Sequence, residues 1–337
     1  MESQTAQTSP REDAPPPRLA GPRVMIGAAG TATAFGIAKT LRTTWPEEIE
    51  IVVADMRPRY LVGAAIFADG YVQSPPVDDS GYPEWLAATL AETSSTLYVP
   101  LIDADIAIAA ELADAGSCGA AVAAPPLAAS RICWDKLETY EWLRGEGLPA
   151  PPTWAPDAAP RRGEGLVAKS RHGQGSIGFR PLGSLAELEA LSGDEDLVVQ
   201  EACRHPEVTI DVFLAGDGGA FRAICRERIE VKAGVCTKAR VFESEELSGL
   251  AERVARALGL RGFCMQVMQD AEGRWTITDL NARPGAGGRL STAAGVDVLG
   301  AVYADLVGLP FDLEARTMRR LEHDVYVIRQ FDEHIVD

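Results

Sequence analysis

The most informative stretch of this sequence is Asp279-Leu280-Asn281-Ala282-Arg283-Pro284-Gly285-Ala286-Gly287-Gly288. It completes an apolar run, Trp275 to Leu280, that predicts a β-strand. Because side chains alternate between the two faces of a strand, Asp279, Asn281 and Arg283 share one face. A carboxylate, an amide and a guanidinium in one row are unfavourable in an apolar core, but they suit a hard cation bridged to phosphates. The row therefore predicts a magnesium and phosphate site, and a solvated sheet face is the alternative.

Two features beside this row favour the site. The preceding predicted strand, Phe263 to Met268, carries Gln266, whose amide oxygen is also a suitable ligand for a hard cation. The segment that follows the row, Pro284 to Gly288, is rich in glycine and is typical of a site loop. Gln266, Asp279 and Asn281 are therefore the candidate metal ligands.

A second glycine-rich segment, Ser170-Arg171-His172-Gly173-Gln174-Gly175-Ser176-Ile177-Gly178, follows the predicted strand Leu166 to Lys169. Glycine lets backbone N–H groups approach a polyphosphate without a Cβ in the way. Lys169, at the strand end, and Lys136, at a predicted helix start, carry charges that can neutralise phosphate oxygens. Taken alone, the loop is predicted equally well as a phosphate clamp and as an ordinary hairpin tip.

The N-terminal third of the chain alternates strands and helices, which predicts a parallel sheet. Folded structure is expected to begin at Arg23, in an apolar strand that leads into Gly27-Ala28-Ala29-Gly30. Later strands end at Asp55 and just before Asp103 and Asp105, where ligands of such sheets bind. Each aspartate is also a good helix cap or turn residue, so that alternative stays open.

The composition indicates which kinds of partner the protein has and where it is located. The formal net charge of -17 and the pI of about 4.7 argue against nucleic acid or an anionic membrane as partner, and favour a small molecule. Met1 to Pro22 has no apolar segment of signal or transmembrane length, which predicts a disordered leader and a cytoplasmic protein. The six cysteines show no metal-binding spacing and are expected to be reduced thiols.

In their order along the chain, these residues resemble the ATP-grasp superfamily. The resemblance spans roughly Val24 to Pro310, and the ordered set is far more specific than any single motif. It is closest to the branch around the large subunit of carbamoyl phosphate synthetase and related amino-acid ligases. The motifs that carry it are Asp135-Lys136, Lys169 with the glycine-rich loop, Gln200-Glu201-Ala202-Cys203 with Glu207, Gln266, and the stretch from Asp279 to Gly288.

The resemblance implies an α/β fold, with an α+β C-terminal part and two lobes that clamp ATP. The expected organisation is a disordered leader at 1–22, a Rossmann-like parallel-sheet domain at 23–126, a small lobe with the glycine-rich loop at 127–197, and a large lobe with the metal and substrate site at 198–337.

The resemblance also implies a role for each matching residue. ATP is expected to contact Lys136, Lys169, Gly173, Gly175, Ser176, Gly178, the adenine hinge Glu201, Ala202 and Cys203, and Glu207 at the ribose. Gln266, Asp279 and Asn281 would bind two Mg²⁺ ions, with Mn²⁺ as a substitute, and Arg283 and Lys238 would act in catalysis.

Substrate candidates are Arg226, Arg228, Lys232, Gly287 and Arg289. A basic strand carrying Arg226, Arg228, Lys232 and Lys238 would face phosphates or an acidic substrate, and a solvated charged strand is predicted equally well.

The implied activity is an ATP-dependent ligase that joins a small carboxylic acid, such as an amino acid, to an amine or a related nucleophile through an acyl phosphate. A homodimer is one expected assembly. A carboxylate or carbamate kinase is the nearest alternative, and a regulatory module that binds ATP without catalysis is another. A nicotinamide oxidoreductase is also considered, because Gly27 to Gly30 follows a strand and Asp55 ends the next. Its glycine spacing does not fit, and it leaves Lys136 and Lys169 unexplained.

Overall fold

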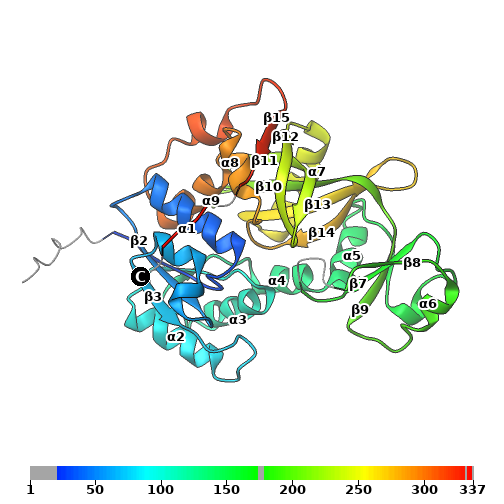
Figure 1. Cartoon of the computed structure of the whole chain (residues 1–337), viewed down its shortest axis with the longest axis horizontal. Helices are drawn as coiled ribbons and strands as arrows, with labels where there is room; N and C mark the ends of the chain where they lie inside the picture. Colours follow the sequence, from blue (N-terminus) through cyan, green and yellow to red (C-terminus); the bar gives the residue numbers. More distant parts are fainter. Residues whose placement is uncertain (1–20, 174–177, 331, 336–337) are drawn as a thin grey trace, which may run out of the picture.

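The computed structural model describes residues 21–173, 178–330 and 332–335 (Figure 1). Most of the predicted leader, residues 1–20, lies outside the described residues, and so do Gly175 and Ser176 of the glycine-rich loop. Three β-sheets with helices packed against them make up the described chain. None of the described helices is long and apolar enough to cross a bilayer.

The N-terminal sheet is parallel, as the alternation of strands and helices predicts, with strand order β3-β2-β1-β4-β5. Helices α1 and α9 cover one face, and α2 and α3 cover the other. Both faces are therefore buried, which explains the continuous apolar runs of the strands. The elements are β1 Arg23–Ile26, α1 Ala32–Thr44, β2 Glu50–Asp55, β3 Gly70–Gln73, α2 Tyr82–Glu92, β4 Leu97–Val99, α3 Asp103–Asp114 and β5 Ala121–Val122.

Two helices, α4 Leu127–Trp134 and α5 Lys136–Gly145, replace the single helix that the sequence predicts over Ser130 to Leu148. The break falls at Asp135, whose backbone is extended at φ -99° and ψ 116°. Its carboxylate accepts hydrogen bonds from the backbone N–H groups of the first turn of α5, at 2.9 and 3.4 Å. An aspartate in this position caps a helix N-terminus, so a second helix begins here.

The small sheet has strand order β6-β9-β7-β8 and packs against α6. In Figure 1 it lies at one end of the molecule, on the far side of α5 from the parallel sheet. The boundary expected between residues 197 and 198 falls at the start of β9, and this strand pairs within the small sheet, which therefore ends at Glu201. The elements are β6 Thr153–Trp154, β7 Leu166–Ser170, β8 Arg180–Leu182, α6 Leu185–Glu189 and β9 Leu197–Glu201.

The large sheet has strand order β14-β13-β10-β11-β12-β15, and every pairing in it is antiparallel. Helix α7 covers it with an apolar stripe, as its sequence periodicity predicts. The prediction of one basic strand is wrong, because the chain turns at Gly234 (φ +77°) and Lys238 lies on β12. The elements are β10 Arg204–Leu214, β11 Phe221–Lys232, β12 Val235–Phe242, α7 Glu245–Leu258, β13 Gly262–Gln269, β14 Trp275–Asn281 and β15 Val325–Ile328.

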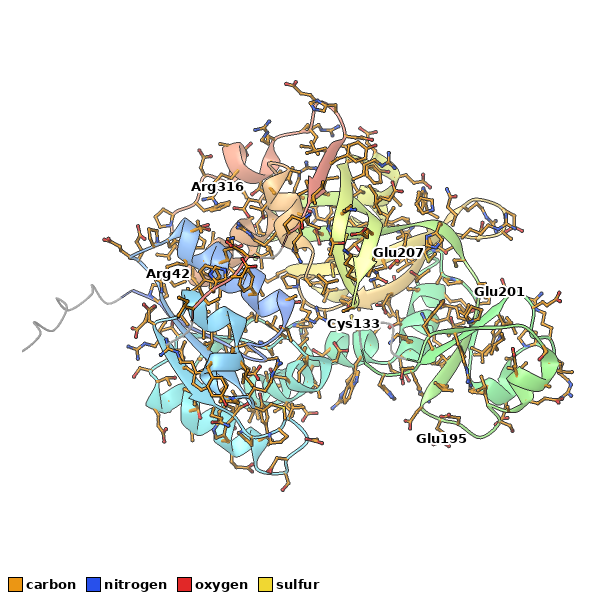
Figure 2. All side chains as sticks on the ribbon, viewed as in Figure 1. Arg42, Cys133, Glu195, Glu201, Glu207 and Arg316 are labelled. Atoms are coloured by element: carbon orange, nitrogen blue, oxygen red, sulfur yellow. The ribbon has the colours of Figure 1, made fainter. Side chains whose placement is uncertain are left out.

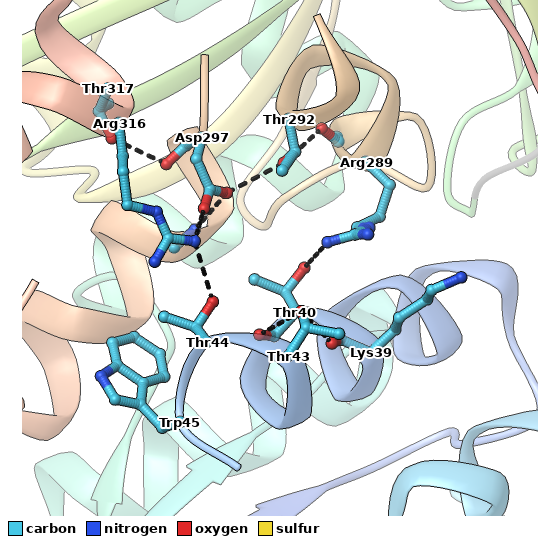
Figure 3. Close-up of polar contacts among 12 residues, drawn as sticks. Lys39, Thr40, Thr43, Thr44, Trp45, Arg289, Thr292, Asp297, Arg316 and Thr317 are labelled. Atoms are coloured by element: carbon cyan, nitrogen blue, oxygen red, sulfur yellow. Dashed lines mark hydrogen bonds and ion pairs between the residues drawn. The ribbon is translucent and has the colours of Figure 1, made fainter. Parts of the chain in front are cut away.

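The C-terminal helices α8 Gly288–Ala293 and α9 Val298–Val307 join the large sheet to the parallel sheet. Tyr303 of α9 is buried in the same core as α1. Polar contacts close the junction (Figure 3): Arg316 donates to Asp297 at 2.6 Å and to Thr44 of α1 at 3.1 Å. The junction holds the C-terminal end of α1 against the segment that follows α9. Short helical turns lie at Arg59–Leu61, Gly63–Phe67, Pro156–Ala158 and Glu314–Met318.

Removing the Asp135 cap should destabilise the chain. Asp135→Ala loses the cap of α5 and the ion pair with Arg171 at 2.7 Å, and we expect a loss of about 1–2 kcal/mol in the free energy of unfolding. Asp135→Asn is the matched control, since asparagine also caps helices, and it should cost less. Denaturant unfolding of the three proteins is the measurement. Equal losses in both variants would mean that the cap contributes nothing.

Candidate active site

Two clefts meet at the edge of the large sheet. The first, which we call the lobe cleft, lies between the small and large sheets and has a volume of about 270 Å³. The second, the domain cleft, lies between the first turn of α1 and the large sheet and has a volume of about 340 Å³. Gln266 and Asp279 line both clefts, so they form a shared wall. A molecule in each cleft would meet its neighbour at these two side chains.

The two candidate lysines lie in the lobe cleft. Lys169 leaves the end of β7 and donates to the carbonyl oxygen of Thr278 at 3.0 Å. Burial lowers the pKa of its ammonium to about 8, although Asp279 favours the charged form. Lys136, the first residue of α5, donates to the carbonyl oxygen of Gly173 at 2.8 Å. Among the described residues neither lysine pairs with a carboxylate within 4.0 Å, which leaves both charges for an anionic ligand.

The described ends of the glycine-rich loop explain two of its glycines. Gly173 has φ +94° and Gly178 has φ +73°, a backbone conformation that other residues rarely adopt. The base of the loop is held to α5, because Lys136 donates its backbone N–H to the Arg171 carbonyl at 3.1 Å and Arg171 pairs with Asp135. Sequence reasoning missed this role of Asp135 and Arg171; the signal was the aspartate directly before a helix start.

The predicted adenine hinge lies at the mouth of the lobe cleft. Glu201 and Cys203 line it, whereas the N–H of Ala202 donates to the Gly165 carbonyl at 2.9 Å. Glu207, the candidate ribose ligand, lines the same cleft from the large sheet (Figure 2). It forms an ion pair with Arg228. The structure therefore places the predicted hinge and ribose side chains around one cavity.

The candidate metal ligands lie side by side. Gln266 is the register partner of Asp279 across β13 and β14, and the Asn281 amide donates to the Asp279 carboxylate at 3.1 Å. In the described chain no group of three or more His, Cys, Asp or Glu side chains could hold a metal ion. One carboxylate and two amide oxygens still suit Mg²⁺, which commonly takes few protein ligands and completes its shell with phosphates and water.

Arg283 and Asp103 stand next to this row. Arg283 is buried and lines the domain cleft with Asn281. Asp103 begins α3 and comes from the parallel-sheet domain. Burial raises the pKa of its carboxyl group, and Asp279 adds to the effect while Arg283 and Lys136 oppose it. The strand-end position that marked Asp103 in the sequence therefore brings its carboxyl group near the candidate metal row.

Arg226 and Arg228 of β11 line the domain cleft, but their charges are already balanced. Arg226 is almost fully buried and binds the Asp211 carboxylate through two nitrogens, at 3.2 and 3.3 Å. Arg228 pairs with Glu207. Gly287 lies against the guanidinium of Arg226: a Cβ there would be 2.2 Å from its central carbon, so only glycine fits. These arginines are part of the wall, and Gly287 is required by their packing.

Three of the predicted basic site residues, Lys232, Lys238 and Arg289, are not among the residues that line either cleft. Lys238 and Lys232 both pair with Glu230 on the β11–β12 hairpin, at 2.9 and 3.5 Å. The structure therefore does not bring Lys238 to the lining of a cleft, where its predicted catalytic role would require it. Arg289 points toward α1 and donates to Thr40 at 3.3 Å (Figure 3).

The glycine turn after β1 is closed by side chains of its own domain. The backbone N–H of Gly30 donates to the Asp55 carboxylate at 2.7 Å, and the same carboxylate pairs with Arg57. A Cβ on Gly30 would lie 1.8 Å from the Arg57 guanidinium. Asp55 is therefore a turn residue in this structure.

Asp105 is buried beneath this turn and should make stability depend on pH. It accepts hydrogen bonds from the hydroxyls of Tyr98 and Tyr82, and burial raises its pKa from 3.8 to about 6. The folded chain therefore binds this proton more tightly than the unfolded chain. The contribution of Asp105 to stability is fully present below pH 3.8 and is lost as the pH rises through about 6. A shift of about two pKa units corresponds to about 3 kcal/mol.

Asp105→Asn should lack this dependence, because asparagine keeps the shape without the charge. Unfolding free energies at pH 5 and pH 8 should show the wild type losing stability relative to the variant by about 1.4 kcal/mol. Parallel pH curves for the two proteins would refute the assignment.

Comparison with known proteins identifies a domain that supplies most residues of the two clefts. Residues 133–287 match the ATP-grasp domain. The D-alanine–D-alanine ligase of Stutzerimonas stutzeri is 28% identical over 186 residues, which cover 47% of this chain and 57% of that protein. The chain thus spans little more than half the length of the curated relatives it matches.

Solved structures show the same fold over most of the chain. N5-carboxyaminoimidazole synthetase from Staphylococcus aureus, complexed with ADP, has a TM-score of 0.67 at 14% identity and covers 87% of this chain and 79% of its own. The biotin carboxylase domain of Hydrogenobacter thermophilus 2-oxoglutarate carboxylase has a TM-score of 0.66 at 16% identity, covering 89% and 70%. The predicted resemblance is confirmed over this part of the chain: residues 133–287 match the ATP-grasp domain.

Proposed function

We propose that this chain is an ATP-dependent ligase that joins a small carboxylic acid, such as an amino acid, to an amine through an acyl phosphate. The observation that carries the proposal is the wall shared by the two clefts. ATP in the lobe cleft and a carboxylate in the domain cleft would meet at Gln266 and Asp279. Arg283 lies on the carboxylate side and the two lysines on the nucleotide side.

The relatives support this reading. The curated matches are ligases by name, and the S. aureus structure holds ADP. Because the chain spans little more than half of those ligases, its own substrates have to be found by experiment. The acidic net charge of -17 supports small molecules over nucleic acid as partners.

The first step would be phosphoryl transfer. A carboxylate oxygen attacks the γ-phosphorus, the bond from that phosphorus to the ADP oxygen breaks, and an acyl phosphate forms. The protein contributes position and charge, and no nucleophilic side chain is needed. Lys136 and Lys169 would hold the phosphates, and Arg283 would stabilise charge on the transferred group. Mg²⁺, with two ions proposed and Mn²⁺ as a substitute, would be held by Gln266, Asp279 and Asn281 and would neutralise phosphate oxygens.

The second step would be acyl transfer. The amine attacks the carbonyl carbon of the acyl phosphate, the C–O bond to phosphate breaks, and inorganic phosphate leaves. The nitrogen loses a proton to solvent as the amide forms. An enzyme that stopped after the first step would be the kinase alternative.

A phosphate-release screen tests the proposal. The full chain with MgATP is offered amino acids and other small acids, singly and in pairs with amines. Release that requires two compounds supports a ligase, whereas an acyl phosphate made from one compound supports the kinase alternative. ATP binding with no release from any combination would favour the regulatory module. Binding of NAD and not of ATP would overturn the nucleotide assignment altogether.

A further inference from the structure

Two partly buried arginines, Arg289 and Arg329, lie beside the glycine-rich turn at 285–288. Arg329 donates to the Ala286 carbonyl at 2.8 Å, and Arg289 donates to the Thr40 hydroxyl at 3.3 Å. Both partners are neutral. Within residues 21–173, 178–330 and 332–335, no carboxylate lies within 4.0 Å of either guanidinium. Partly buried charge without a counter-charge is costly, which indicates that these groups have a partner not supplied by the described chain.

Neighbouring arginines show the contrast. Arg226 and Arg316 are each matched by an aspartate, at 3.2 and 2.6 Å. Burial lowers the pKa of Arg329, and the nearby charges of Arg226 and Arg289 lower it further. Burial also lowers the pKa of Arg289; the carboxylate of Asp297 opposes the effect, and Arg316 adds to it. Positive charge therefore accumulates at this place, although the whole chain is strongly acidic.

Arg329 lies at the border of the domain cleft, and Arg289 follows directly after the turn at 285–288. Ala286, which accepts the hydrogen bond from Arg329, lines this cleft, and so do Gly287 and Arg226. The first turn of α1, residues 31–33, lines it as well. Asp279 lies on the wall shared with the lobe cleft, where the carboxylate would be phosphorylated. One side of the domain cleft thus holds Asp279, where phosphoryl transfer is proposed. The turn at 285–288 forms another side, next to arginines that have no carboxylate partner in the described chain.

We propose that Arg289 and Arg329 bind a second anionic group of the substrate, a carboxylate or a phosphate ester, in addition to the carboxylate that is phosphorylated. This inference rests on the proposed function. Guanidinium groups bind carboxylate and phosphate oxygens through paired N–H donors, and the fit is better than that of an ammonium group. The substrate class is therefore a dianionic acid, such as a dicarboxylic amino acid or a phosphorylated hydroxy acid.

The test compares substrates that differ in charge and little in shape. Phosphate release by the full chain is measured with glutamate against glutamine, aspartate against asparagine, and O-phosphoserine against serine. In at least one pair, we expect the KM of the anionic substrate to be at least about tenfold lower than the KM of its neutral counterpart. A preference for glutamate or aspartate identifies a carboxylate as the second group, and a preference for phosphoserine identifies a phosphate ester.

Variants connect the preference to the two arginines. Arg289→Gln and Arg329→Gln should each erase the preference and leave ATP affinity unchanged, while Arg329→Lys should retain part of it. Arg320→Gln is the matched control, because Arg320 lies in the same C-terminal segment with 74% of its side chain exposed. ATP affinity reports in every case whether the variant is folded.

A binding measurement separates the two proposals. Calorimetry of the chain saturated with a non-hydrolysable ATP analogue, with glutarate and inorganic phosphate as probes, needs no turnover. The arginine site is supported if either probe binds to the wild type and not to Arg289→Gln or Arg329→Gln. This result would hold even if no compound releases phosphate. If neutral members release phosphate as well as anionic ones, or if the glutamine variants keep the preference, the arginine site is refuted and the ligase proposal stands.

Discussion

Replacing Arg283 with methionine is expected to lower turnover by about two to three orders of magnitude while ATP affinity stays near its wild-type value. Arg283 lines the domain cleft. The candidate metal ligand Asp279 lies between this cleft and the lobe cleft, where ATP is proposed to bind. In the proposed reaction the partner of Arg283 is charge that develops during phosphoryl transfer and in the acyl phosphate. An interaction made only in the transition state lowers kcat and kcat/KM together when it is removed.

The matched comparison is Asp279→Asn on the same strand. This change keeps the shape but removes the carboxylate from the metal row, so Mg²⁺ should bind less tightly and activity should recover partly at high metal concentration. Rate against Mg²⁺ concentration, measured for both variants, distinguishes the roles. The assignment fails if both respond alike to added metal, or if Arg283→Met turns over normally. Circular dichroism of both proteins checks that the buried arginine is not needed for folding.

Replacing Lys169 with alanine should weaken ATP binding by about tenfold to hundredfold and change the free energy of unfolding little. A charge-assisted contact with a phosphate contributes about 1.5–3 kcal/mol. In the free protein the ammonium is already held in an unfavourable buried position, so little stability depends on it. Calorimetric titration with ATP is the measurement. Lys232→Ala is the control, because Lys232 is 64% exposed on the β11–β12 hairpin and lies outside the clefts.

The pKa of Lys169 adds a pH signature. Burial lowers it to about 8 in the unliganded chain, so the ammonium loses its proton as the pH rises past that value. Bound phosphate would favour the charged form, and ATP affinity should therefore fall from pH 7 to pH 9. Lys169→Ala should lack this fall. Unchanged affinity in a folded Lys169→Ala protein would remove the residue from the site.

The local sequence was sufficient to predict features that depend on residues close together in the chain. The period of two predicted that Asp279, Asn281 and Arg283 share a face, and all three line the domain cleft. The sequence from Glu245 to Leu258 predicts a helix, and α7 has the same bounds. Alternating strands and helices predicted the parallel sheet. Each of these features depends on backbone periodicity, which a single segment reports by itself.

Tertiary structure decided which of the basic residues reach a cleft. Arg226 and Arg228 line the domain cleft, but Asp211 and Glu207, from the neighbouring strand, balance their charges. Lys238 lines neither cleft and pairs with Glu230 across the β11–β12 hairpin. Strand β9 joins the small sheet through pairing with β7. Strand partners and ion pairs join residues far apart in sequence, and many pairings are compatible with the same local pattern. Only the packing of the whole chain selects one set of pairings. Arg329 is an example: no local pattern marks it in the sequence, and the folded chain brings it to the border of the domain cleft.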